Sequence, residues 1–349
     1  MNSDRVFIIA EAGVNHNGSL ALAMELADAA LAVGADAVKF QSFRAADVVT
    51  PDARTAEYQL NNTGESNQFE MIKKLELSEL DHQALALHCK KIGIEFFSTP
   101  FSEDALAMLL RIGVRRLKIP SGEITNKRLI VSAAKSGLPL LLSSGMSTME
   151  EVSTAVGWVH EGRLMRPRQS DCPGNLVLLH CTSAYPAPPD SLNLRALQTM
   201  SDALLLPVGY SDHSEGTEAA LAAVALGARV IEKHLTLDVN MPGPDHRASA
   251  DPRTFAAMVR GVRLVEVMRG DGAKQPQPIE RNTRDVARRS LVLNRNVRRG
   301  QIVEAQDLCL RRPGTGLPPE MWESLLGRRM KIDAAAHTLL TLEMLEIKE

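Results

Sequence analysis

The sequence predicts a (β/α)8 barrel, an α/β fold of TIM-barrel type, followed by a small C-terminal domain. Short apolar runs alternate with helical patterns eight times within the first 270 residues. These runs are almost continuously apolar, as strands buried on both faces of a parallel sheet must be. Polar residues follow nearly every run. An open doubly wound sheet, the alternative fold, would instead gather them around a single switch point.

Each expected strand is an apolar run that ends abruptly in polar residues. In chain order, the expected strands are Val6–Ala12, Ala37–Ser42, Glu95–Thr99, Arg116–Pro120, Leu138–Ser143, Leu176–Cys181, Leu206–Ser211 and Val230–His234. A helical pattern follows each strand. The expected helices are Leu20–Val33, Leu80–Ile92, Glu103–Arg111, Lys127–Ser136, Thr148–His160, Leu194–Ala203, Thr217–Leu226 and Pro252–Met268.

Two connections in this pattern are unusually long. Residues 43–71 contain "AEYQLNNTGESNQFE", and a loop of this length inside a compact domain is often functional, here as a lid over the barrel mouth. The second connection contains "GDGAKQPQPIERNTR" and is typical of a linker. We therefore expect a barrel at 1–270, a linker at 271–285 and a small mixed domain at 286–349. So small a domain has little room for a core and gains from packing against another surface.

Composition limits the classes of partner. The net charge is −2, so there is no basic excess for nucleic acid. The first apolar run is too short for a signal peptide or a membrane span. The four cysteines, Cys89, Cys172, Cys181 and Cys309, lack the spacing of a metal site or a disulfide framework. They suggest reduced thiols in a cytoplasmic protein.

A histidine follows or ends each of the last two expected strands. His213 comes after "GYSD" and His234 ends "VIEKH". Consecutive strands of a parallel sheet usually lie side by side, so the two imidazoles would face the same space. Two imidazoles with carboxylates nearby favour a divalent-metal site. The alternative is two unrelated histidines at the rim of the barrel.

Two lysines, Lys39 and Lys118, lie within otherwise apolar strands. A buried ammonium group is costly unless it is paired. Each lysine is either a structural partner of Glu11 or Glu123, or part of an anion site with the hydroxyl residues at neighbouring strand ends. A small molecule with phosphate and carboxylate groups fits the anion site. Cys181 is interpreted as packing, and His16 as either a ligand or an ordinary loop histidine.

At this point the residues resemble a known family, the sialic acid synthases. The blocks that carry the resemblance are "IAEAGVNHNGS", "AVKFQSF", "FFSTPF", "LKIPSGEITN", "LLSSGM", "LLHCTSAYPAP", "GYSDHS", "VIEKHLTLD" and "GPDHRAS". The C-terminal "RRPGTG" resembles the antifreeze-like (SAF) domain of these enzymes. The likeness spans essentially the whole chain and keeps the family's order of motifs.

The resemblance implies a transferase that condenses phosphoenolpyruvate with an N-acylated mannosamine-type sugar and releases phosphate. Its implied metal ligands are His213 and His234, with Mn²⁺ expected and Mg²⁺ or Co²⁺ as alternatives. The implied catalytic residues are Glu123, Lys118, His213 and His234. The implied donor site consists of Lys39, Thr99, Lys118, Ser121, Ser143 and Ser211. The implied sugar site consists of Glu11, Gln41, Tyr185, Asp245 and Arg312, with Arg312 supplied by a neighbouring subunit of a domain-swapped homodimer. Arg311 is the alternative to Arg312.

The acceptor sugar is less well specified than the donor. The resemblance places N-acetylneuraminate synthase first, acting on N-acetylmannosamine. The alternative is N,N'-diacetyllegionaminate synthase, acting on 2,4-diacetamido-2,4,6-trideoxymannose. "GPDH" favours these two branches over the pseudaminic branch. Two further hypotheses are a sugar-phosphate keto-acid synthase, which would need another basic cluster, and a non-catalytic carbohydrate-binding protein.

Overall fold

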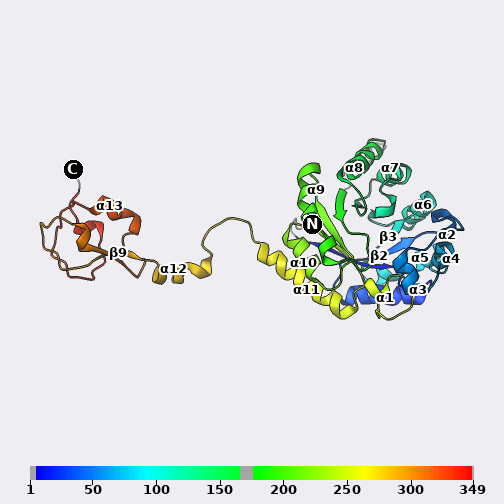
Figure 1. Cartoon of the computed structure of the whole chain (residues 1–349), viewed down its shortest axis with the longest axis horizontal. Coiled ribbons are helices and arrows are strands. Elements are labelled where there is room, and N and C mark those ends of the chain that lie inside the picture. The colour runs from blue at the N-terminus through cyan, green and yellow to red at the C-terminus, as the bar shows by residue number, and fades with distance from the viewer. Residues whose placement is uncertain (1–4, 166–175, 348–349) are drawn as a thin grey trace. The chain divides into compact units, whose positions relative to one another are not determined.

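The computed structural model describes residues 5–165 and 176–347, which form two compact units, Met1–Gly270 and Asp271–Glu349. The first unit is the expected TIM-like barrel, in which eight parallel strands are ringed by helices (Figure 1). The strands are β1 Phe7–Gly13, β2 Ala37–Ser42, β3 Glu95–Pro100, β4 Leu117–Ile119, β5 Leu140–Ser143, β6 Leu176–His180, β7 Val208–Asp212 and β8 Val230–His234. The sequence therefore predicts the fold class correctly.

Strand pairing brings the first and last strands together. The hydrogen-bonded order is β3-β2-β1-β8-β7-β6-β5-β4, so β1 pairs with both β2 and β8. Strands β3 and β4 are the ends of this order and also lie beside each other, so the barrel is nearly closed. All eight carboxyl ends consequently surround one space, where the active sites of such barrels lie.

The outer helices are α1 Leu20–Ala32, α5 Glu79–Ile92, α6 Glu103–Ile112, α7 Lys127–Ser136, α8 Met149–Leu164, α9 Ala196–Leu204, α10 Glu218–Ala225 and α11 Pro252–Arg269. Short polar side chains cap several helix starts. Ser78 and Thr148 begin α5 and α8 with capping boxes, in which the side chain and an acidic residue three positions later satisfy free backbone groups. Gly93 ends α5 in the left-handed conformation.

Proline explains the main differences between the expected and observed strand bounds. Strand β4 ends at Ile119 rather than at Pro120, and β5 begins at Leu140, after Pro139. Strand β7 likewise begins at Val208, after Pro207. Proline has no N–H to donate to a ladder, so it lies at strand ends.

The long connection after β2 is not structureless. It contains three short helices, α2 Ala45–Val48, α3 Glu57–Thr63 and α4 Gln68–Lys73. Gly64 ends α3 in the left-handed conformation, and the Asn67 side chain caps α4. These turns fold the segment back on itself, and they place several of its side chains beside the barrel mouth.

The second unit has its own small core around an antiparallel pair of strands. Strand β9 Ser290–Leu293 pairs with β10 Leu308–Arg311. Leu291, Leu293 and Leu308 belong to a buried cluster in this unit. Residues 281–287, which fall mostly in the expected linker, form helix α12 Arg281–Ala287, and a further short helix is α13 Trp322–Leu325.

Cys89, Cys181 and Cys309 are free thiols, and Cys172 lies outside the described residues. In the part of the chain that the structure describes, every helix is too short or too polar to span a membrane.

Candidate active site

A cavity of about 510 Å³ opens at the carboxyl ends of the barrel strands. Each strand, or the residue directly after it, contributes to its wall. Most residues proposed from the sequence lie there. These are Glu11, Lys39, Gln41, Thr99, Lys118, Ser121, Ser143, Tyr185, Ser211, His213, His234 and Asp245. Glu123 and Arg312 are not among the residues that line it.

Strand alternation explains which side chains enter the cavity. Glu232 and His234 are two residues apart on β8 and therefore share a face. Between them, Lys233 points to the other face, where its Nζ pairs with Asp212 Oδ2 of β7 at 2.7 Å. This outward pair is almost fully buried, and it ties β7 to β8 at the residues next to His213 and His234 in the chain.

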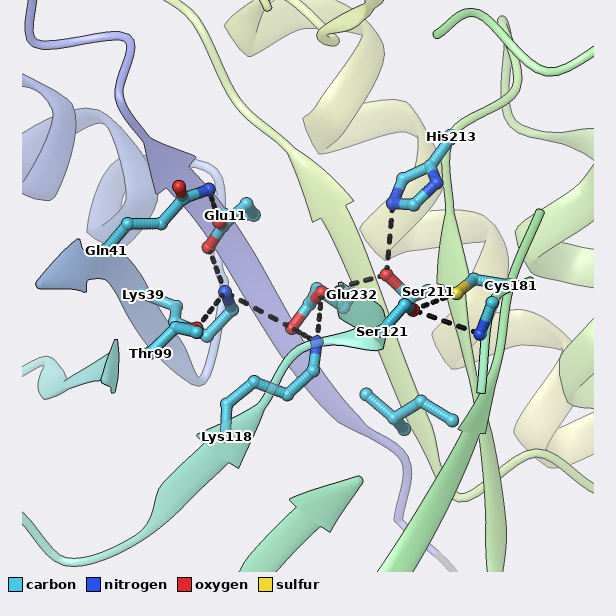
Figure 2. Close-up of polar contacts among 12 residues, drawn as sticks. Glu11, Lys39, Gln41, Thr99, Lys118, Ser121, Cys181, Ser211, His213 and Glu232 are labelled. Carbon is cyan, nitrogen blue, oxygen red and sulfur yellow. Dashed lines mark hydrogen bonds and ion pairs between the residues drawn. The ribbon is translucent and has the colours of Figure 1, made fainter. Parts of the chain in front are cut away.

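Four charged residues meet at the centre of the cavity, and we call Glu11, Lys39, Lys118 and Glu232 the charged cluster. Lys39 Nζ lies 2.6 Å from Glu11 Oε2 and 3.8 Å from Glu232 Oε2. Lys118 Nζ donates to both Glu232 oxygens, at 2.7 and 3.0 Å. Figure 2 shows the two ammonium groups converging on Glu232. All four side chains are almost fully buried.

Burial and pairing act against each other in this cluster. Burial alone would raise the pKa of Glu232, but the Lys118 and Lys39 ammonium groups lower it well below its usual range. At Lys39, burial is likewise outweighed by Glu11 and Glu232, which raise its pKa. At Lys118, burial is the larger effect and lowers the pKa in spite of Glu232. Glu232 is thus held as a carboxylate between the lysines.

Hydroxyl groups surround the lysines. Lys39 Nζ donates to Thr99 Oγ1 at 2.9 Å, and Ser211 Oγ donates to Glu232 Oε1 at 2.8 Å. Ser121 Oγ accepts from the backbone N–H of Gly145 at 3.0 Å. Ser143 Oγ is buried without a hydrogen-bond partner. A buried hydroxyl without a partner, in the same cavity as the two lysines, fits hydrogen bonding to a bound anion.

The two histidines lie close to each other in the same cavity. Their ring centroids are 5.6 Å apart. His213 Nδ1 donates to the Thr182 carbonyl at 2.7 Å, which leaves Nε2 as an acceptor facing the cavity, 3.3 Å from Ser211 Oγ. His234 Nδ1 is buried without a hydrogen-bond partner and lies 3.9 Å from Asp245 Oδ2. Burial raises the pKa of Asp245 to about 7, with a further contribution from Glu11.

This arrangement fits a divalent metal. Metal-binding histidine must be neutral, and burial lowers the pKa of His213 to about 4 and that of His234 well below its usual value. The carbonyl contact of His213 fixes its ring orientation, as a second partner does in many metal sites. Within residues 5–165 and 176–347, no three or more His, Cys, Asp or Glu side chains are grouped to hold a metal. Two histidines would therefore leave several coordination positions to substrate and water.

The outer wall of the cavity is more apolar. Tyr58 of α3 stacks on Tyr185, with ring centroids 5.1 Å apart, and Tyr185 in turn lies 4.3 Å from the His213 ring. Val49 and Met71, from the same long connection, also line the wall. Asn62 Nδ2 donates to the Pro244 carbonyl at 2.7 Å, which ties α3 to the loop after β8.

Two proposed site residues lie elsewhere. Glu123 is half-buried on the turn that also carries Ser121, and its Oε2 accepts from Asn126 at 2.7 Å. Arg312 belongs to the second unit and is exposed.

Sequence reasoning missed Glu232 and Tyr58. The available signal for Glu232 was its position two residues before His234 in an apolar strand, which places both side chains on the cavity face. No comparable signal marks Tyr58, because its place depends on how the long connection folds.

Comparisons with known proteins support the motif resemblance. Residues 26–274 match the NeuB family, and residues 288–346 match the SAF domain. The N,N'-diacetyllegionaminic acid synthase of Legionella pneumophila is 47% identical over 97% of this chain and 94% of its own. The Campylobacter jejuni enzyme of the same name is 42% identical over 93% of this chain and 95% of its own.

A solved structure shares the architecture. The N-acetylneuraminic acid (sialic acid) synthetase of Leptospira borgpetersenii serovar Hardjo-bovis, in complex with citrate, is 37% identical, with a TM-score of 0.69. The match covers 80% of this chain and 90% of that one.

Proposed function

We propose that this chain, which belongs to the NeuB family, is an N,N'-diacetyllegionaminate synthase. It would condense phosphoenolpyruvate with 2,4-diacetamido-2,4,6-trideoxymannose and water, giving a nine-carbon 2-keto sugar acid and phosphate. The observation that carries this proposal is the meeting of two lysines, several hydroxyl side chains and two neutral histidines in one cavity. That combination suits an anionic donor beside a metal-held acceptor.

The choice of acceptor reverses the order expected from the motifs, which placed N-acetylneuraminate first. The two legionaminic acid synthases are 47% and 42% identical to this chain, and the sialic acid synthetase is 37% identical. The apolar outer wall around Tyr58, Val49 and Met71 is also consistent with a sugar that carries a second acetamido group and a methyl group.

The chain's residues can divide the chemistry between them. Lys39, Lys118 and the nearby hydroxyls would hold the donor's phosphate and carboxylate in place, which lowers the entropic barrier. A divalent metal, with Mn²⁺ expected, would polarise the aldehyde oxygen when bound by His213 and His234. The donor's enol carbon attacks the aldehyde carbon, and water adds to the resulting cationic carbon. The tetrahedral intermediate then loses phosphate by carbon–oxygen cleavage.

Glu123 remains a proposal for proton transfer at the aldehyde. Its support is its position on the same turn as Ser121 and Gly122, both of which line the cavity. For the sugar itself, Glu11, Gln41, Tyr185 and Asp245 are proposed contacts. Gln41 Nε2 donates to Glu11 Oε1 at 3.0 Å, so these two would act as one polar unit. A cytoplasmic location and the absence of a nucleic-acid partner stay predictions.

Acceptor preference tests the proposal. With phosphoenolpyruvate and Mn²⁺, phosphate release should be faster with the diacetamido sugar than with N-acetylmannosamine. We expect kcat/KM to differ by roughly 10- to 200-fold, the range for a group accommodated in an apolar pocket. Reactions without an acceptor provide the background rate. A preference for N-acetylmannosamine would instead identify an N-acetylneuraminate synthase, and no release with either sugar would reject the condensing activity.

Arg312 leads to a proposal about assembly. The side chain is exposed, and the "RRPG" motif resembles the one that supplies an arginine to a neighbouring subunit's sugar site. Such exchange requires an oligomer, most simply a domain-swapped twofold dimer. We expect Lys118→Met protein and Arg312→Ala protein, each impaired alone at a donor concentration below the raised KM of Lys118→Met, to regain activity on mixing, because one site per heterodimer combines an intact barrel with an intact arginine. Recovery should approach about half of the wild-type rate per heterodimer.

The same mixing experiment, with Arg311→Ala protein in place of Arg312→Ala protein, decides between the two arginines. Subunit exchange is verified with differently tagged chains. Confirmed exchange without recovered activity would show that Arg312 does not act across an interface.

A further inference from the structure

The Glu232 carboxylate lies at the point where the two lysine ammonium groups and the Ser211 hydroxyl meet. It accepts two hydrogen bonds from Lys118 and one from Ser211, and Lys39 approaches one of its oxygens to 3.8 Å. Three of the residues proposed to bind phosphoenolpyruvate therefore already face a carboxylate of the chain itself (Figure 2). An incoming donor anion must share or replace these contacts.

We propose that Glu232 competes with phosphoenolpyruvate for Lys118 and Ser211, and thereby makes donor binding depend on the divalent metal. This inference rests on the proposed function. Glu232 acts here as a positioning residue for the lysines, since it touches their ammonium groups and no part of the reaction is assigned to it.

Charge balance is the physical reason. The two carboxylates of the charged cluster formally cancel its two ammonium groups. Phosphoenolpyruvate carries a carboxylate and a phosphate of nearly two negative charges at neutral pH. A buried pocket of no net charge cannot compensate the loss of hydration of such an anion. A divalent cation at the histidines would supply the positive charge that the cluster lacks.

Ser211 links the two parts of the site. Its Oγ lies 2.8 Å from Glu232 Oε1 and 3.3 Å from His213 Nε2, so a single hydroxyl contacts both the charged cluster and the proposed metal ligands. If the role of Glu232 were only to neutralise the lysines during folding, its removal would lower stability without changing how donor affinity depends on metal.

Calorimetric titration of phosphoenolpyruvate into metal-free protein, with and without added Mn²⁺, tests the inference without requiring turnover. For the wild type we expect Mn²⁺ to tighten binding by roughly 5- to 150-fold, the range typical of coupled sites. Glu232→Gln should bind the donor more tightly than the wild type when metal is absent, and Mn²⁺ should then add little. Glu232→Asp keeps the charge and should retain the metal requirement.

Glu95→Gln is the matched control, because Glu95 pairs with Arg116 at 2.6 Å outside the cavity wall. It should behave as the wild type. If Glu232→Gln does not fold, Glu232→Ala provides the same comparison with space for water beside the lysines. A folded variant whose donor affinity and metal dependence equal those of the wild type overturns this inference alone. Failure of the wild type to bind phosphoenolpyruvate even with Mn²⁺ overturns the proposed donor as well.

Discussion

Replacing His213 or His234 by alanine is expected to lower metal-dependent phosphate release by about 10³-fold or more. A Lewis acid at the acceptor oxygen is worth several kcal/mol of transition-state stabilisation, and each histidine is one of only two proposed protein ligands. The loss should therefore be the largest produced by any single substitution in the site. It should appear together with weaker Mn²⁺ binding in a direct titration.

Folding must be verified separately in these variants. Both histidines are buried at the ends of β7 and β8, with 6% and 5% exposure. His213→Ala also removes the donor to the Thr182 carbonyl. His88→Ala is a suitable control, because His88 pairs with Asp28 on the outer helices. Near-wild-type turnover of a folded His213→Ala or His234→Ala protein, after chelation and addition of Mn²⁺, would defeat the metal assignment.

Replacing Lys118 or Lys39 by methionine should produce the second largest effect, on the donor. Methionine keeps most of the stem volume but removes the charge. A hydrogen bond to a charged group is worth roughly 1.5–3 kcal/mol, so the KM for phosphoenolpyruvate should rise by about 10- to 150-fold. Lys118→Met also leaves Glu232 without its closest partner, so we expect a loss of stability of roughly 3–5 kcal/mol for a broken buried pair. Steady-state kinetics on folded protein separate the two effects, and unchanged donor KM and kcat in both variants would make the lysines purely structural.

The barrel was predictable because its signals are local. Apolar runs and helical periods recur along the chain, and the polar residue at each strand end follows from strand length and alternation. Lys39, Lys118 and His234 could thus be placed at one end of the barrel from the amino-acid sequence alone. The sequence left open whether the lysines pair with carboxylates or bind an anion, and the structure shows that they do pair.

The partner that the sequence did not identify was Glu232. Expected partners were Glu11 and Glu123, and only Glu11 contacts a lysine. Glu123 instead accepts a hydrogen bond from Asn126. Which carboxylate meets which ammonium group depends on the stagger of strands that are far apart in the chain, and a local pattern contains no information about that stagger. The same limit applies to Tyr58, which reaches Tyr185 only because α3 folds over the barrel mouth.

The central claim is that the two lysines of the charged cluster, Lys39 and Lys118, hold phosphoenolpyruvate. Direct titration of the donor into two variants, one inside the cavity and one outside it, tests this claim best. Lys118→Met is compared with Arg116→Met, whose residue lies two positions earlier and pairs with Glu95 rather than with the cavity. Both variants lose one ion-paired cation, and both are titrated in Mn²⁺ after their melting temperatures are recorded. We predict that donor affinity falls by about 10-fold or more in Lys118→Met and stays at the wild-type value in Arg116→Met. Equal donor affinity in wild type, Lys118→Met and Arg116→Met would contradict the account.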